Sequence, residues 1–188
     1  VRSRLQRQMC IRDSTCSLVP SYHSPDKKDY TSYRQPRQVD DSTVVAVKSG
    51  LKDINSLVTI VHGKEKRLSY IGSINSRLDY RNGKIYWTEI VPGLRWTHEN
   101  YSVLKCYDLK EGRIKSITPR QRYLSPSVDK NGKVAAVSRT TVDGKNQLVL
   151  VELEDGKELF AFQVPGNAFI KELTFTDQDE VVAVSYTH

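Results

Sequence analysis

The chain has 188 residues with a formal net charge of +7, 38% hydrophobic residues and 27% charged residues. Its length suggests one domain, and because no run of about 18 apolar residues occurs, the sequence excludes a membrane-spanning helix within it. Its three cysteines form neither a disulfide framework nor a zinc pattern. Only Cys106, which alternates with Leu104, is expected to be a small buried residue.

The two ends differ in character from the rest of the chain. Residues 1–14 and about 184–188 resemble translated sequencing-adapter read-through, so we expect neither stretch to belong to the biological protein. The alternative for residues 1–14 is a basic arm that binds nucleic acid. That stretch holds four Arg and one Asp, so without it the net charge of +7 falls by three to +4. The other basic residues are interleaved with acids, which disfavours a nucleic-acid partner.

Residues 15–40 are polar and contain three prolines that interrupt regular structure. We expect an irregular linker whose tyrosines pack on the first regular unit. Basic and aromatic residues alternate within it, which is also typical of a ligand or nucleic-acid surface. These residues are Lys27, Lys28, Tyr30, Tyr33, Arg34 and Arg37.

From residue 41 the sequence predicts short strands separated by turns. No segment has a convincing 3.6-residue apolar period, so the chain is predicted to be all-β. The expected strands are 44–48, 57–61, 67–71, 84–91, 102–108, 114–118, 133–139, 147–153, 158–164, 170–176 and 180–184.

A unit of roughly 45 residues is repeated. Asn-Gly-Lys-Ile at 82–85 returns 49 residues later as Asn-Gly-Lys-Val at 131–134, and the turn at 108–113 returns 44 residues later at 152–157. This period is typical of a β-propeller blade. We therefore predict a partial β-propeller with about three four-stranded antiparallel blades and part of a fourth. The expected blades are about 41–80, 81–128 and 129–172, with the next starting at 173–183. A β-sandwich with a coincidental repeat is the rival fold.

Two segments carry a resemblance to a known family. Residues 127–137, Ser-Val-Asp-Lys-Asn-Gly-Lys-Val-Ala-Ala-Val, resemble the Trp-Ser-Pro-Asp-Gly-Lys-x-Ile-Ala pattern of TolB-like propeller blades, and residues 173–183 resemble it more loosely. The Pro is missing from both copies. The resemblance, with a Bacteroidetes-like character, implies a periplasmic, envelope or secreted scaffold that binds a protein, a peptide or a glycan. It also implies an alternative, the gating propeller of a prolyl-oligopeptidase-like serine peptidase whose catalytic domain lies outside this chain.

The repeat is irregular at one place. The interval from Gly83 to Gly112 exceeds the interval from Gly132 to Gly156 by five residues, and the additional residues fall in the loop 92–100. This loop contains Arg95, Trp96, His98 and Glu99, which supply a cationic fork, an aromatic face and a proton-accepting pair. We predict that these four residues form a binding site, the alternative being that Trp96 anchors the loop to its own blade.

No catalytic, metal-binding or cofactor-binding motif was found in the sequence. It lacks the His-Glu-x-x-His pattern, the Gly-x-Ser-x-Gly elbow and the phosphate-binding Gly-rich loop. The acidic stretch at 177–180 has calcium-type oxygen ligands, but it occupies a hairpin turn and is expected to be solvated. We therefore expect no catalysis within this chain, no cofactor and no metal.

Overall fold

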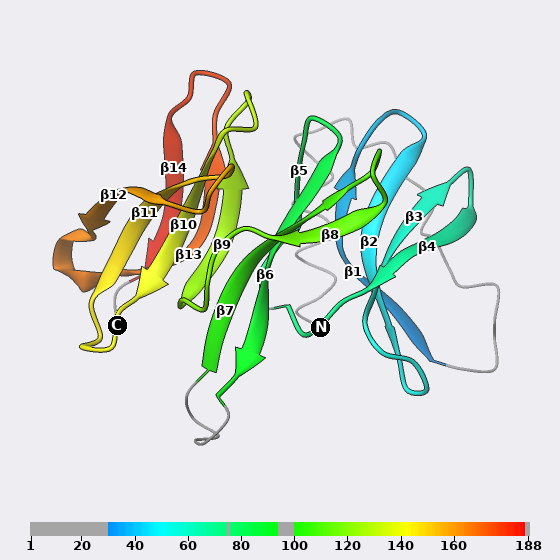
Figure 1. Ribbon diagram of the computed structural model, residues 1–188, viewed down its shortest axis with the longest axis horizontal. Helices are drawn as coiled ribbons and strands as arrows, with labels where there is room; N and C mark the ends of the chain where they lie inside the picture. The colour runs from blue at the N-terminus through cyan, green and yellow to red at the C-terminus, as the bar shows by residue number, and fades with distance from the viewer. Residues whose placement is uncertain (1–29, 75, 94–99, 187–188) are drawn as a thin grey trace, which may run out of the picture.

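The computed structural model describes residues 30–74, 76–93 and 100–186. Over these ranges the chain is made of β-strands and one short 3-10 helix, Pro165–Asn167, without an α-helix, which confirms the all-β prediction (Figure 1). No helix in this part of the chain is long and apolar enough to cross a membrane.

The strands form four separate antiparallel sheets, each a meander in sequence order. Three sheets have four strands and the fourth has two. The first blade contains β1 (Thr31–Gln38), β2 (Thr43–Gly50), β3 (Ser56–Val61) and β4 (Lys64–Tyr70). The second contains β5 (Asp79–Arg81), β6 (Lys84–Pro92), β7 (Asn100–Asp108) and β8 (Arg113–Ser116). The third contains β9 (Tyr123–Val128), β10 (Val134–Thr140), β11 (Asn146–Glu152) and β12 (Glu158–Gln163), and the fourth β13 (Phe169–Phe175) and β14 (Val181–Tyr186).

This arrangement is an open, partial propeller with three blades and part of a fourth, which confirms the predicted fold. The two Asn-Gly turns occupy equivalent places, because each joins the first and second strands of its sheet. At the first turn, Asn82 and Gly83 both have positive φ, 49° and 77°. A two-residue type I′ hairpin turn requires this backbone at both positions, and Asn-Gly is the pair that adopts it most readily.

The blade boundaries differ from those expected from the repeat by one strand. The Asn-Gly turn was placed at the start of a blade, whereas in the structure a first strand precedes it, as β5 and β9 do. Both strands are hard to recognise in the sequence. β5 has only three residues, and β9 contains Ser-Pro-Ser in place of an apolar alternation.

A strand also lies within the segment 15–40, for which an irregular linker was expected. β1 pairs with β2 along its length, with a bulge between Arg34 and Arg37. The bulge holds Gln35, at a φ of 54°, and Pro36, which has no N–H to donate. Because β1 lies at the edge of its sheet, a proline in a bulge is tolerated there. Residues 15–29 of the same segment lie outside the described residues.

The core lies between blades rather than within one sheet. Along β6, Ile85 and Trp87 pack with residues of the first blade, whereas Tyr86 packs with residues of the third. Successive side chains of a strand point to opposite faces, so a strand with a blade on each side must be apolar on both. This two-sided burial explains why strands such as β6 contain runs of consecutive apolar residues and do not alternate strictly between apolar and polar residues. A further cluster joins the third blade to β13 through Ala136, Leu173 and Phe175.

Polar ties connect the first strands of neighbouring blades. Asp79 of β5 accepts a hydrogen bond from the backbone N–H of Val128 in β9, at 2.7 Å. One blade further on, the Ser127 hydroxyl oxygen accepts from the backbone N–H of Phe175 in β13, at 3.0 Å. Arg37 of β1 reaches Asp79 at 3.1 Å. The same contact thus recurs at intervals of 49 and 48 residues.

Apolar side chains are exposed where the fourth sheet has only two strands. Phe160 and Phe162 of β12 pair with Leu150 and Leu148 of β11, which pack toward the fourth sheet. Residues directly opposite in an antiparallel pair share a face, so both phenylalanines point the same way, yet they are 55% and 46% exposed. Because these side chains are exposed, we predict that the isolated chain is prone to aggregate.

Candidate functional site

The four residues predicted as a binding site, Arg95, Trp96, His98 and Glu99, lie outside the described residues. The hairpin that carries their loop is described up to residue 93 and from residue 100 onward. Its strands β6 and β7 have nine residues each, whereas the equivalent β10 and β11 have seven. The larger spacing found in the sequence therefore includes longer strands as well as a loop.

The base of this hairpin is braced by a buried acid. Glu89 is 9% exposed and accepts hydrogen bonds at both carboxylate oxygens, from Trp87 Nε1 at 3.2 Å and from Lys105 Nζ at 2.5 Å. A Cβ added to Gly72 would lie 2.9 Å from this carboxylate. Because both oxygens are occupied and the side chain is enclosed, Glu89 is suited to holding the hairpin and not to exchanging protons with a ligand.

A small cavity of about 280 Å³ lies beside the hairpin, between the second and third blades. It is lined by Ile90, Asn100, Tyr101, Ser102, Arg122, Leu124 and Thr140. Three of the seven lining residues are aliphatic or aromatic and one carries a guanidinium group, so the cavity suits an apolar group with a polar end. The cavity reaches Asn100, the residue at which the described part of the hairpin resumes.

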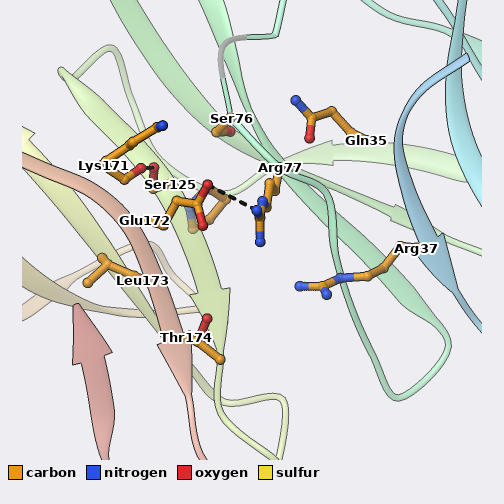
Figure 2. Close-up of a pocket in the computed structure, with 10 residues that line it drawn as sticks. Gln35, Arg37, Ser76, Arg77, Ser125, Lys171, Glu172, Leu173 and Thr174 are labelled. Atoms are coloured by element: carbon orange, nitrogen blue, oxygen red, sulfur yellow. Dashed lines mark hydrogen bonds and ion pairs between the residues drawn. The ribbon is translucent and has the colours of Figure 1, made fainter. Parts of the chain in front are cut away.

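A larger cavity of about 370 Å³ lies among the first strands of the blades, at the axis of the propeller (Figure 2). Its lining comes from all four blades: β1, the segment before β5, β9 and β13. The residues are Gln35, Arg37, Ser76, Arg77, Ser125, Pro126, Lys171, Glu172, Leu173 and Thr174. We call this cavity the axial pocket.

Charges in the axial pocket are paired across blades. Arg77 NH2 lies 3.0 Å from Glu172 Oε1, joining the second blade to β13 (Figure 2). Arg37 NH2 lies 3.1 Å from Asp79 Oδ1, behind the wall. The guanidinium groups remain partly open to solvent, with side-chain exposures of 42% for Arg37 and 61% for Arg77.

The two serine hydroxyls of the axial pocket form hydrogen bonds within the fold. Ser76 forms a hydrogen bond of 2.8 Å with the Thr88 hydroxyl, and Ser125 donates to the backbone carbonyl of Lys171 at 2.5 Å. No histidine is among the residues that line the pocket, and both serine hydroxyls already form hydrogen bonds within the fold. The lining gathers charged and polar groups from several blades, which suits a polar ligand.

The thiol and the acids elsewhere are also placed structurally. Cys106 is buried, as predicted, and burial raises the pKa of its thiol, which disfavours the reactive thiolate. Among residues 30–74, 76–93 and 100–186, no three His, Cys, Asp or Glu side chains are grouped so that they could hold a metal ion. The acidic stretch at 177–180 lies in the β13–β14 turn, where Asp179 pairs with Lys130 at 3.1 Å.

Sequence reasoning missed the axial pocket. Arg37 was noted only as part of a basic and aromatic stretch in the expected linker, and Arg77, Lys171 and Glu172 were not singled out. Arg37 and Arg77 are 40 positions apart in the chain, and Arg77 and Glu172 are 95 positions apart. They line the same pocket because each lies in or beside the first strand of its blade. The available signal was the polar character of those first strands.

Comparisons with known proteins support the fold. No protein-family model matches the sequence, and no curated protein is significantly similar to it. Among solved structures, TolB from Acinetobacter baumannii is similar with a TM-score of 0.58 at 12% identity, covering 82% of this chain and 37% of that one. The putative TolB from Agrobacterium tumefaciens is similar with a TM-score of 0.60 at 10% identity, covering 77% and 50%.

The β-propeller domain of the Trilobed protease from Pyrococcus furiosus is similar with a TM-score of 0.51 at 16% identity, covering 73% of this chain and 43% of that one. This chain therefore spans half or less of the length of each of these three proteins. At such identities the likeness concerns the fold alone. Together with the four meander sheets and the axial pocket, it establishes that the chain has the fold of a TolB-like β-propeller.

Proposed function

We propose that the chain is a sector of a non-catalytic binding scaffold, a TolB-like propeller that holds a protein, peptide or glycan partner in the bacterial envelope. The axial pocket carries the proposal. Its polar side chains converge from four blades, while both of its serine hydroxyls form hydrogen bonds within the fold. Ligand pockets commonly have a few converging polar groups on a rigid frame, and the inter-blade ties supply that frame here.

The loop of the second blade is proposed as a second contact area. Arg95, Trp96, His98 and Glu99 remain candidates on the strength of the longer repeat and their chemistry, since binding residues concentrate on loops held by a rigid scaffold. The cavity bounded by Ile90 and Tyr101 at the base of this hairpin would receive the same partner. The TolB-like fold favours a periplasmic or envelope location for such a scaffold.

The alternative is a gating propeller that selects substrates for a prolyl-oligopeptidase-like serine peptidase domain elsewhere in the parent polypeptide. The fold of the Trilobed protease propeller domain and the axial position of the pocket favour this alternative. The sequence of the parent gene separates the two functions. A Gly-x-Ser-x-Gly motif followed by Asp and His would favour the peptidase, and further blades followed by a stop codon would favour the scaffold.

Selection from a displayed library of random peptides tests the binding function directly. Thr174 is exposed and lines the axial pocket, so Thr174→Trp should fill the pocket without entering a core. Val142, 88% exposed on the β10–β11 loop, provides the control Val142→Trp. We expect selected peptides to lose at least tenfold in affinity with Thr174→Trp and to keep it with Val142→Trp. Peptides that bind both variants equally, or a library from which none is selected, would contradict the proposal.

A further inference from the structure

The axial pocket carries more positive than negative side chains. Arg37, Arg77 and Lys171 line it together with a single acid, Glu172. The three cations come from three different blades and line the same pocket. Figure 2 shows the guanidinium groups of Arg37 and Arg77 on one side of it and Lys171 on the other. The lining therefore has a net charge of +2 from these four groups, and it favours an anionic ligand.

The cations keep unused hydrogen-bond donors. A guanidinium group has five N–H donors, and for both Arg37 and Arg77 the ion pair engages NH2 alone. For the Lys171 ammonium, no hydrogen bond or ion pair is formed with any residue in the described ranges. An incoming carboxylate can therefore find free donors on all three cations, and Arg forks are well matched to that group.

The other residues of the lining favour a peptide over a nucleic acid or a sugar as the ligand. None of the ten lining residues is aromatic, whereas nucleic-acid bases bind by stacking on aromatic side chains and sugar rings commonly pack on the same kind of surface. The volume of about 370 Å³ lies at the low end of the roughly 300–1,000 Å³ of ligand pockets, so a few residues of extended chain fit and a folded domain does not.

We propose that the axial pocket binds an extended acidic segment of a partner protein, with Arg37, Arg77 and Lys171 contacting its Asp or Glu carboxylates. This proposal rests on the proposed binding function and specifies its ligand. Glu172 has a distinct part in it, because its carboxylate competes with the ligand for Arg77. The pair Arg77–Glu172 is thus both an inter-blade contact and a determinant of affinity.

The two members of this pair allow a test that separates binding from structure. The probe is a short fluorescent peptide that alternates Glu with Gly, and its anisotropy is measured with the 188-residue chain at low salt. Arg77→Gln should weaken binding roughly three- to tenfold, and Glu172→Gln should strengthen it by a similar factor. Each variant breaks the same ion pair, so a purely structural effect would change affinity in the same direction for both.

The control for the loss of a surface arginine is Arg113→Gln. Arg113 is 74% exposed and pairs with Glu111 at 2.6 Å, outside the axial pocket, so affinity should not change. Equal binding of the matching Lys-Gly peptide, changes of the same sign for Arg77→Gln and Glu172→Gln, or tighter binding of an oligogalacturonate than of the peptide would each overturn the acidic-peptide proposal. If library peptides still require the open pocket tested by Thr174→Trp, the proposed scaffold function survives that result.

Discussion

Asp79 is the residue whose loss should most clearly uncouple the blades. It is 4% exposed and accepts hydrogen bonds from the backbone N–H of Val128 at 2.7 Å and from Arg37 at 3.1 Å. Asp79→Ala leaves the buried Val128 N–H without its acceptor, at a cost of about 1–3 kcal/mol. Because the Arg37 side chain is 42% exposed, its ion pair adds at most about 1 kcal/mol. We therefore expect a loss of about 1–4 kcal/mol in the free energy of unfolding.

Urea denaturation measures this loss, and hydrogen exchange of the Val128 amide measures its local part. The control is Asp177→Ala, an exposed acid in the β13–β14 turn, which should change stability by no more than about 0.5 kcal/mol. The amide of Val128 should exchange faster in Asp79→Ala even if the variant remains folded. A stability loss equal to that of the control, with unchanged exchange at Val128, would refute the role of Asp79 in joining blades.

Three other predictions concern the backbone, pH and solubility. A Cβ at Gly156 would lie 2.1 Å from a carbonyl oxygen, whereas Gly144, with almost the same φ, has nothing within 4 Å. In thermal denaturation, Gly156→Ala should therefore lower the free energy of unfolding by at least about 3 kcal/mol, and Gly144→Ala by about 1–2 kcal/mol. Equal losses for the two variants would contradict the close contact at Gly156. Burial raises the pKa of Tyr86 from 10.0 to about 12, so the unfolded chain loses this proton at a lower pH than the folded chain. The free energy of unfolding should therefore fall as the pH rises from 10 to 12. Tyr86→Phe should make the free energy of unfolding less sensitive to pH in this range. Replacing Phe160 and Phe162 by Ser should reduce light scattering with little change in the melting temperature, since both are about half exposed; unchanged scattering would exclude this surface as the cause of aggregation.

The sequence predicted the later strands of each blade well and missed the first strands β1, β5 and β9, for a physical reason. Strands such as β6 and β10 have a blade on each side, so their runs of apolar residues are conspicuous. β1 and β5 lie toward the axis, where the Arg37 side chain projects into a polar pocket and Asp79 ties three blades together. Their polar sequences do not alternate regularly, and β1 was therefore assigned to a linker.

The same cause concealed the candidate site. Arg37 lies in β1 and Arg77 just before β5, whereas Lys171 and Glu172 lie in β13, which was expected as the strand 170–176. Only the closing of the blades around an axis brings Arg77 to within 3.0 Å of Glu172. A motif search finds residues that lie near one another in the chain, so it selected the loop 92–100. The propeller architecture itself, by contrast, follows from a local repeat and could be recognised before any contact was known.

The hydrogen bonds that recur between first strands join each blade to the one beside it. Asp79 connects the second and third blades, and Ser127 connects the third and fourth. The partly exposed Arg77–Glu172 pair connects blades that are not neighbours, but an ion pair at the surface adds little stability. Opening should then spread inward from the ends, as in a one-dimensional chain of coupled units. The two-stranded fourth sheet, with a single described neighbour and its outer strand β14 exposed, should exchange its amides first, and the β6 and β10 amides should exchange last.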